Sequence, residues 1–208
     1  MPLNQLIEYY HLKIKGIIHV GASDGQEAEL YKSCGIARVF WIEAIPTVFE
    51  RLCSRLEYFP GNRAFCACIT DKDEEEIIFN ITNNNGESSS IFNLKNHKSY
   101  YPHIKVVETI QLKTLKLDTL VEREELLIDG QVNFIILDIQ GAELLALEGF
   151  INNLKFIDYI YLEICIDEYY ENGAKVKDIN IFLEKQGFSF IAEQRTNMGW
   201  GDRLYIRK

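Results

Sequence analysis

Two patterns of hydrophobic and polar positions alternate along this chain. Short apolar runs rich in β-branched residues predict buried strands over residues 17–20, 38–43, 62–69, 132–139 and 158–165. Apolar residues at helical spacing predict helices over residues 3–12, 27–34, 46–56, 142–149 and 176–186. Strands that alternate with helices predict an α/β fold, in which helices cover both faces of a mostly parallel sheet.

The last two predicted strands, 188–192 and 203–207, are separated by a turn rather than a helix. A connection that short joins antiparallel strands, because parallel neighbours need a longer crossover. The sequence therefore predicts a doubly wound, mostly parallel, seven-stranded sheet that ends in a C-terminal antiparallel hairpin. With no internal repeat or linker, residues 1–208 are predicted to form a single domain.

The middle of the chain interrupts this regular order. Residues 82–110 contain a polar, turn-rich loop (83–90) and an irregular Tyr-Tyr-Pro-His segment. Further strands are predicted on either side of the loop, over 77–81 and 105–112. Loops on a rigid scaffold commonly carry recognition, so we expect this insertion to contact a substrate.

Composition restricts the classes of partner. The chain is 47% hydrophobic and 25% charged, which is typical of a globular domain. No apolar run approaches the ~20 residues that cross a membrane, and the start lacks a secretory pattern, so a cytoplasmic protein without a membrane partner is expected. The five cysteines have no zinc-like spacing, so we expect buried free thiols and no metal site. A net charge of −9 with dispersed basic residues argues against a nucleic-acid partner.

The strand over 17–20 runs into the turn Gly21-Ala-Ser-Asp-Gly25, and helix-forming residues follow. Such junctions favour nucleotide-like ligands, because glycines let the backbone come close and a helix end presents N–H groups. The G-x-x-x-G spacing differs from the G-x-G-x-x-G of pyrophosphate binders. It suits adenosine with an amino-acid tail, so S-adenosylmethionine (SAM) is the predicted cofactor. Gly21, Ala22 and Gly25 would lie beside it, and Asp24 would either receive its ammonium group or cap the helix.

An acidic residue follows the glycine turn at the spacing that ribose binding requires. Glu43 ends the second strand, 22 residues after Gly21. An acid about 20 residues after such a turn can accept hydrogen bonds from both ribose hydroxyls. The alternative is that Glu43 caps the helix that begins near Pro46. The predicted cofactor contacts also include its neighbour Ala44 and Ser89 of the polar loop, unless that loop is only solvated.

Further polar residues follow the later strands. Asp138 ends the strand over 132–139, and Gln140 and Glu143 come directly after it. Glu163 lies near the end of the next strand. Because ligands of open α/β sheets bind outside the carboxyl ends of the strands, these side chains are predicted to converge with Glu43. We expect Asp138 and Glu143 to contact the cofactor and Gln140 and Glu163 the substrate, although Asp138 could also cap a helix.

In several blocks the chain resembles the FkbM family of SAM-dependent O-methyltransferases. The blocks are Ile-His-Val-Gly-Ala-Ser-Asp-Gly25, Trp41-Ile-Glu-Ala-Ile-Pro46, Ser88-Ser-Ser-Ile91, Leu115-Lys-Leu-Asp-Thr-Leu120, Phe134-Ile-Ile-Leu-Asp-Ile-Gln-Gly-Ala-Glu143, Leu147-Glu-Gly149, Leu162-Glu-Ile164 and Gly187-Phe188. They run in order from about residue 16 to the end of the chain, and Asp-Ile-Gln-Gly-Ala-Glu is the most specific.

The resemblance implies a Rossmann-like class I fold and methyl transfer from SAM to a hydroxyl of a sugar or secondary metabolite. It also implies cofactor roles for Gly21, Gly25 and Glu43, and site roles for Asp138 and Glu143. The chain departs from the family at His19, where an aspartate is common at the end of the first strand. Asp24 is the predicted substitute that holds the methionine ammonium group.

The expected reaction is an in-line displacement at the methyl group, in which the protein aligns the acceptor and excludes water. A hydroxyl acceptor needs a base, and Asp138 is the first candidate, with His97 or His103 of the insertion as the second. Three alternatives stay open from the sequence. They are a nitrogen acceptor, a non-catalytic module that binds SAM or a partner, and a nicotinamide-dependent oxidoreductase.

Overall fold

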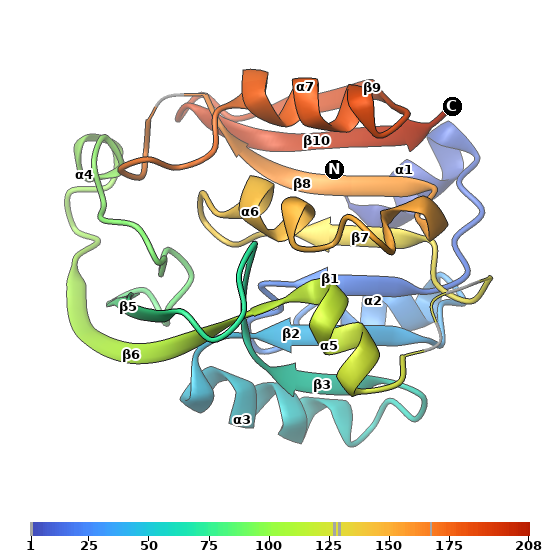
Figure 1. Cartoon of the computed structure of the whole chain (residues 1–208), viewed down its shortest axis with the longest axis horizontal. Helices are drawn as coiled ribbons and strands as arrows, with labels where there is room; N and C mark the ends of the chain where they lie inside the picture. Colours follow the sequence, from blue (N-terminus) through green and yellow to red (C-terminus); the bar gives the residue numbers. More distant parts are fainter. Residues whose placement is uncertain (1, 127, 129, 167) are drawn as a thin grey trace.

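A seven-stranded sheet with the order β3-β2-β1-β7-β8-β10-β9 forms the centre of the computed structural model (Figure 1). The structure describes residues 2–126, 128, 130–166 and 168–208. Its strands are β1 (Ile17–Val20), β2 (Val39–Glu43), β3 (Arg63–Cys66), β7 (Phe134–Leu137), β8 (Tyr159–Cys165), β9 (Phe188–Arg195) and β10 (Trp200–Arg207). The first five strands in this order are parallel, and β10 is antiparallel to both β8 and β9. The predicted sheet and its C-terminal hairpin are therefore confirmed.

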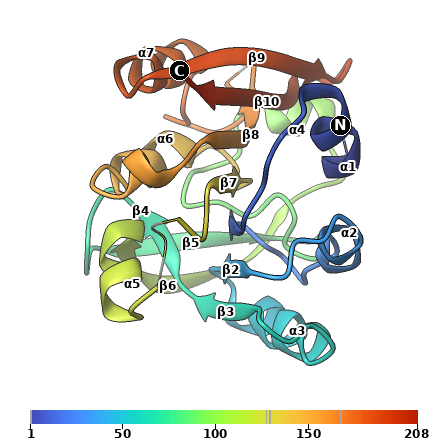
Figure 2. The same cartoon turned by 90° about the vertical axis from the view of Figure 1, so that its right-hand side faces the viewer.

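Helices cover both faces of this sheet (Figure 2). One face carries α1 (Leu3–Tyr10), α2 (Ala28–Ser33) and α3 (Pro46–Leu56). The other carries α5 (Leu117–Arg123), α6 (Glu143–Glu148) and α7 (Val176–Lys185), and a 3₁₀ turn covers Leu154–Phe156. Alternate residues of β1 serve the two faces: Ile17 packs with the first set of helices, and Ile18 with the second. A strand buried on both sides must be apolar throughout, which is why it reads as a continuous apolar run.

A second sheet of three strands, β4-β6-β5, lies beyond the carboxyl ends of the parallel strands (Figure 1). It consists of β4 (Cys68–Thr70), β5 (Glu76–Thr82) and β6 (Val106–Lys116), and α4 (His97–Tyr100) follows the polar loop. The predicted insertion belongs to this part of the molecule. It therefore stands opposite the edge where the parallel strands end.

The structure corrects some local predictions. The predicted strand over 62–69 is two strands, because Arg63–Cys66 pairs with β2, whereas Cys68–Thr70 pairs with β6. Helices α4 and α5 were not predicted, and the first helix ends at Tyr10 rather than at residue 12. The five cysteines are free, but Cys53 and Cys66 are exposed rather than buried. Among the described residues, none of the helices has the length and apolarity to span a bilayer.

Candidate functional site

A cavity of about 430 Å³ lies between the carboxyl edge of the main sheet and the insertion. Its volume falls in the range of small-molecule sites. The predicted site residues that line it are Gly21, Ala22, Glu43, Ala44, Ser89, His97, Asp138, Gln140 and Glu163. Four others, Asp24, Gly25, His103 and Glu143, are not among the lining residues. The structure thus brings together most of the predicted site and leaves four members outside the cavity.

The turn after β1 provides close approach rather than free N–H groups. Gly21 has φ +82°, and a Cβ at this position would lie 1.8 Å from the backbone oxygen of Asp138. The N–H groups of Gly21 and Ala22 both donate to the carbonyl oxygen of Ile42, at 2.9 and 3.0 Å. The N–H groups of these two residues are therefore paired within the fold. The glycine is required because the chain after β1 crosses directly beside the end of β7.

The second half of the turn faces α3 instead of the cavity. Gly25 has φ +75°, and a Cβ there would lie 2.7 Å from Cδ1 of Leu52, so its small size serves packing. Asp24 forms an ion pair with Arg55 of α3, with Nη2 2.8 Å from Oδ2. Arg55 Nε also donates to the Asp24 carbonyl oxygen at 2.7 Å. Asp24 is not a side-chain cap for α2, because that helix has no such hydrogen bond.

Glu43 connects the two turns that border the cavity. Its Oε2 accepts a hydrogen bond from the N–H of Ser23 at 2.9 Å, and its Oε1 accepts one from Ile45 at 2.8 Å. Burial raises the pKa of Glu43, and these backbone hydrogen bonds oppose that rise. Helix α3 has no side-chain cap, so the capping alternative is not observed. Each carboxylate oxygen retains a lone pair, which could accept one of two neighbouring hydroxyl groups.

Asp138 and Glu163 share one amide group. Gln140 Nε2 lies 2.6 Å from Asp138 Oδ1 and 2.6 Å from Glu163 Oε2. The hydroxyl of Tyr170 donates to Gln140 Oε1, and Ser90 Oγ donates to the Gln140 carbonyl oxygen at 2.8 Å. Burial raises the pKa of Asp138 to about 6 and that of Glu163 well above its ordinary value. Near neutral pH this pair can therefore hold one proton on Glu163 while Asp138 is ionised.

Glu143 stabilises the loop after β7 by accepting hydrogen bonds from its backbone. Its Oε1 accepts hydrogen bonds from the N–H groups of Ile139 and Gly141, both at 3.1 Å. The side chain is 3% exposed, and burial raises its pKa to about 7. Its contacts shape the segment that carries Asp138 and Gln140 and do not reach the cavity.

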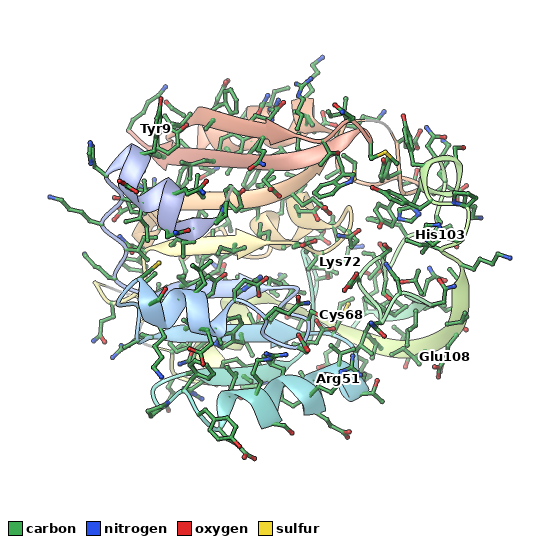
Figure 3. All side chains as sticks on the ribbon, turned by 180° about the vertical axis from the view of Figure 1, so that it is seen from behind. Tyr9, Arg51, Cys68, Lys72, His103 and Glu108 are labelled. Carbon is green, nitrogen blue, oxygen red and sulfur yellow. The ribbon has the colours of Figure 1, made fainter. Side chains whose placement is uncertain are left out.

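His97 and His103, the two histidines predicted as bases, have different surroundings. His97 is buried in the cavity wall, and its Nε2 lies 3.2 Å from Ser88 Oγ. Its Nδ1 is buried and has no hydrogen-bond partner among the described residues. Burial lowers the pKa of His97, which favours the neutral ring. His103 is exposed on the insertion (Figure 3).

His19 is a neutral member of the cavity wall. Its ring packs against those of Tyr31 and Trp41, with centroids 5.9 and 5.3 Å away, and its Nδ1 lies 3.1 Å from the Tyr31 hydroxyl. Burial lowers the pKa of His19 to about 4. The ring therefore carries no charge at neutral pH, so it cannot supply the negative charge of an aspartate at this position.

Sequence reasoning missed an aromatic and an acidic part of the wall. Tyr101 of the insertion, Tyr169 of the loop after β8 and Trp200 of β10 line the cavity together. Glu27, which precedes α2, lines it on the side of the glycine turn. The doublets Tyr100-Tyr101 and Tyr169-Tyr170 were the available signal for the aromatic wall, because each tyrosine offers an apolar ring together with a polar hydroxyl.

Known proteins include a family that this chain matches and solved structures with a similar fold. Residues 19–190 match the family described as "Methyltransferase FkbM domain". The chain is 27% identical over 184 residues to 2-O-methyltransferase NoeI of Sinorhizobium fredii. The matched region covers 85% of this chain and 73% of that protein. The fold is similar to that of Aeropyrum pernix fibrillarin in complex with natively bound SAM, with a TM-score of 0.52, 13% identity, and coverage of 98% of this chain and 71% of that one.

A SAM-dependent methyltransferase from Aquifex aeolicus shares the same fold. Its TM-score is also 0.52, at 10% identity, and the match covers 98% of this chain and 88% of that one. The structural neighbours thus agree that the sheet and its helices are those of the Rossmann-like methyltransferases.

Proposed function

This chain belongs to the FkbM methyltransferase family, and we propose that it transfers the methyl group of SAM to a hydroxyl oxygen of a small, uncharged acceptor such as a sugar or another secondary metabolite. The observation that carries the proposal is the position of Asp138. Its carboxyl group lies at the end of β7, in the same cavity as Glu43 and the Gly21 turn. A base and a nucleoside-binding acid in one cavity are what hydroxyl methylation requires.

The residues on the β2 and β3 side of the cavity fit the adenosine part of SAM. Glu43 offers its remaining lone pairs to two ribose hydroxyls. Beyond it the wall is apolar, which suits a flat adenine ring; it is formed by Ile45, Val48, Ala67, Cys68, Ile69 and Phe79.

When bound, SAM supplies a methyl group attached to positively charged sulfur, which is already activated for displacement. Asp138 accepts the proton of the acceptor hydroxyl as the oxygen attacks, and Gln140 fixes the carboxylate that does so. The Glu163 carboxyl, which keeps its own proton, leaves Asp138 as the ionised member of the pair.

The charge of the wall supports an uncharged acceptor. The described residues that line the cavity include five acids, Glu27, Glu43, Glu87, Asp138 and Glu163, and neither lysine nor arginine. An anionic acceptor would have to enter against these charges without a cationic partner. Tyr101, Tyr169 and Trp200 offer flat apolar faces to a ring. Oxygen is favoured over nitrogen because the relative NoeI is a 2-O-methyltransferase.

The proposal is tested by transfer of labelled methyl groups from SAM to a panel of neutral sugars and hydroxylated metabolites. Asp138→Asn serves as the matched variant. We expect an ether product with the wild-type protein and at least a hundredfold less with Asp138→Asn. A product methylated on nitrogen would contradict the choice of acceptor atom. SAM binding without transfer to any member of the panel would favour the non-catalytic module instead.

A further inference from the structure

Two acidic residues near the glycine turn differ in their surroundings. Asp24 is held by Arg55 through two hydrogen bonds, one to its carboxylate and one to its carbonyl oxygen. It is absent from the residues that line the cavity. Its Oδ2 is therefore paired with a cation outside the site, whereas its Oδ1 is buried and has no hydrogen-bond partner among the described residues.

Glu27 has the opposite situation. It lines the cavity beside His19 and Gln26, and among the described residues no lysine, arginine or histidine forms an ion pair with its carboxylate. Burial raises the pKa of Glu27; the hydrogen bond with its own N–H opposes that rise, as does the charge of Arg55, which is paired with Asp24 and forms no ion pair with Glu27. A half-buried carboxylate without a direct ion-pair partner is costly, so its retention at the cavity wall points to a positively charged ligand group.

The rest of the cavity supplies no such charge. Its two histidines, His19 and His97, have pKa values lowered by burial, and the described lining residues contain neither lysine nor arginine. The cation that meets Glu27 must therefore arrive with the ligand. SAM carries two positive groups, the sulfonium and the α-ammonium of its methionine tail.

The position of Glu27 selects between these two groups. In the sheet, β1 has β2 on one side and β7 on the other. Glu43, at the end of β2, is the place for ribose, while the charge of Glu27 acts on Asp138, at the end of β7, and raises its pKa. The Glu27 carboxylate thus lies within electrostatic range of Asp138. It comes from the segment before α2, next to the turn that the methionine tail would cross.

We propose that Glu27 binds the α-ammonium group of the methionine tail of SAM. This inference rests on the proposed function, because it assigns one contact within the same cofactor site. It explains how the chain can do without an aspartate at the position of His19. It also replaces Asp24, which pairs with Arg55, as the acid that meets the ammonium group.

The test compares two ligands that differ in the amino-acid tail. S-adenosylhomocysteine (SAH) has the tail, and 5′-methylthioadenosine lacks it, so calorimetric titration of both isolates the tail's contribution. For Glu27→Gln we expect SAH to bind at least about tenfold more weakly, with methylthioadenosine affinity within twofold of wild type. Retained methylthioadenosine binding also shows that the site is folded. Glu29→Gln, the same change at an exposed residue of α2, should alter neither affinity.

The possible results separate the inference from the proposed function. If Glu27→Gln binds SAH like the wild type, or if Asp24→Asn loses SAH and Glu27→Gln does not, Glu27 is not the ammonium ligand. An equal loss of both ligands in Glu27→Gln would show a structural role and also overturn the inference. If the wild-type protein binds neither ligand, the proposed cofactor site itself is wrong.

Discussion

The carboxyl groups of Asp138 and Glu163 are joined through one side-chain amide, with Gln140 Nε2 2.6 Å from an oxygen of each. An amide nitrogen has two hydrogens, so it can donate to both groups at once. Tyr170 fixes the orientation of this amide by donating to its oxygen. The arrangement holds two acids of different pKa side by side, which is how a protein can keep one of them available as a base.

Replacement of Asp138 by asparagine should remove the base and leave the cofactor site in place. We expect turnover to fall at least a hundredfold and SAM affinity to change less than threefold. Turnover of the wild-type protein should rise with pH through a midpoint near 6, because burial raises the pKa of Asp138 to about 6 and only the ionised form accepts a proton. The measurement is kcat against pH at saturating SAM. Glu108→Gln, a change at an exposed residue of β6, is the control, and an unchanged rate in Asp138→Asn would exclude Asp138 as the base.

Replacement of Glu43 by glutamine should weaken both SAH and methylthioadenosine, because both ligands contain the ribose. The new NH₂ group would also face the N–H of Ser23 or Ile45, each of which now donates to a carboxylate oxygen. We expect a loss of at least tenfold for both ligands in calorimetric titration. This pattern differs from the one expected for Glu27→Gln. A loss limited to SAH would place the ribose elsewhere.

SAM should bind more tightly than SAH, because its sulfonium enters a cavity with several carboxylates and the thioether of SAH is neutral. A favourable charge contact of about 1 kcal/mol corresponds to roughly fivefold in affinity. Asp138→Asn should reduce this difference, because it removes the carboxylate nearest the acceptor side. Parallel titrations of the two ligands at pH 7.5 measure it. Equal affinities of the wild-type protein for SAM and SAH would show that the acidic residues of the wall do not stabilise the sulfonium.

The buried carboxyl of Glu143 should make the protein less stable as the pH rises. Burial raises its pKa in the folded state from 4.5 to about 7, so the folded protein binds this proton more tightly than the unfolded chain. The stabilisation is complete below pH 4.5 and is lost as the pH rises through 7; it amounts to about 3 kcal/mol. Urea unfolding at pH 5 and pH 8 should show this fall, and Glu143→Gln should reduce it. The same fall in the variant would mean that other groups, such as Glu163, carry the whole effect.

The convergence of acidic residues at the site could be predicted because the main sheet has a simple pattern. Each parallel strand is an apolar run that ends in a polar residue, and the ends of parallel strands meet at one edge. This rule brought Glu43, Asp138 and Glu163 together from sequence positions far apart. It required no knowledge of side-chain direction.

Side-chain direction within turns could not be predicted in this way. Asp24 and Glu27 are three residues apart, but Asp24 pairs with Arg55 of α3, whereas Glu27 lines the cavity. The division of residues 62–69 into two strands had a similar cause. Its second half pairs with Thr114–Lys116, so the break depends on a partner much later in the chain. The aromatic wall belongs to loops, which have no periodicity to read.

Gln140 is also the point where two separate parts of the chain meet. Its side chain touches the acids at the strand ends, while its backbone oxygen receives Ser90 and its side-chain oxygen receives Tyr170. The strand ends supply the contacts predicted for the cofactor, and the loops around 83–105 and 168–175 supply the wall that would face the acceptor. Evolution can therefore change one without rebuilding the other. Descendants of one ancestral scaffold could acquire new acceptors by exchanging these loops, provided that the residue at 140 continues to join the two parts.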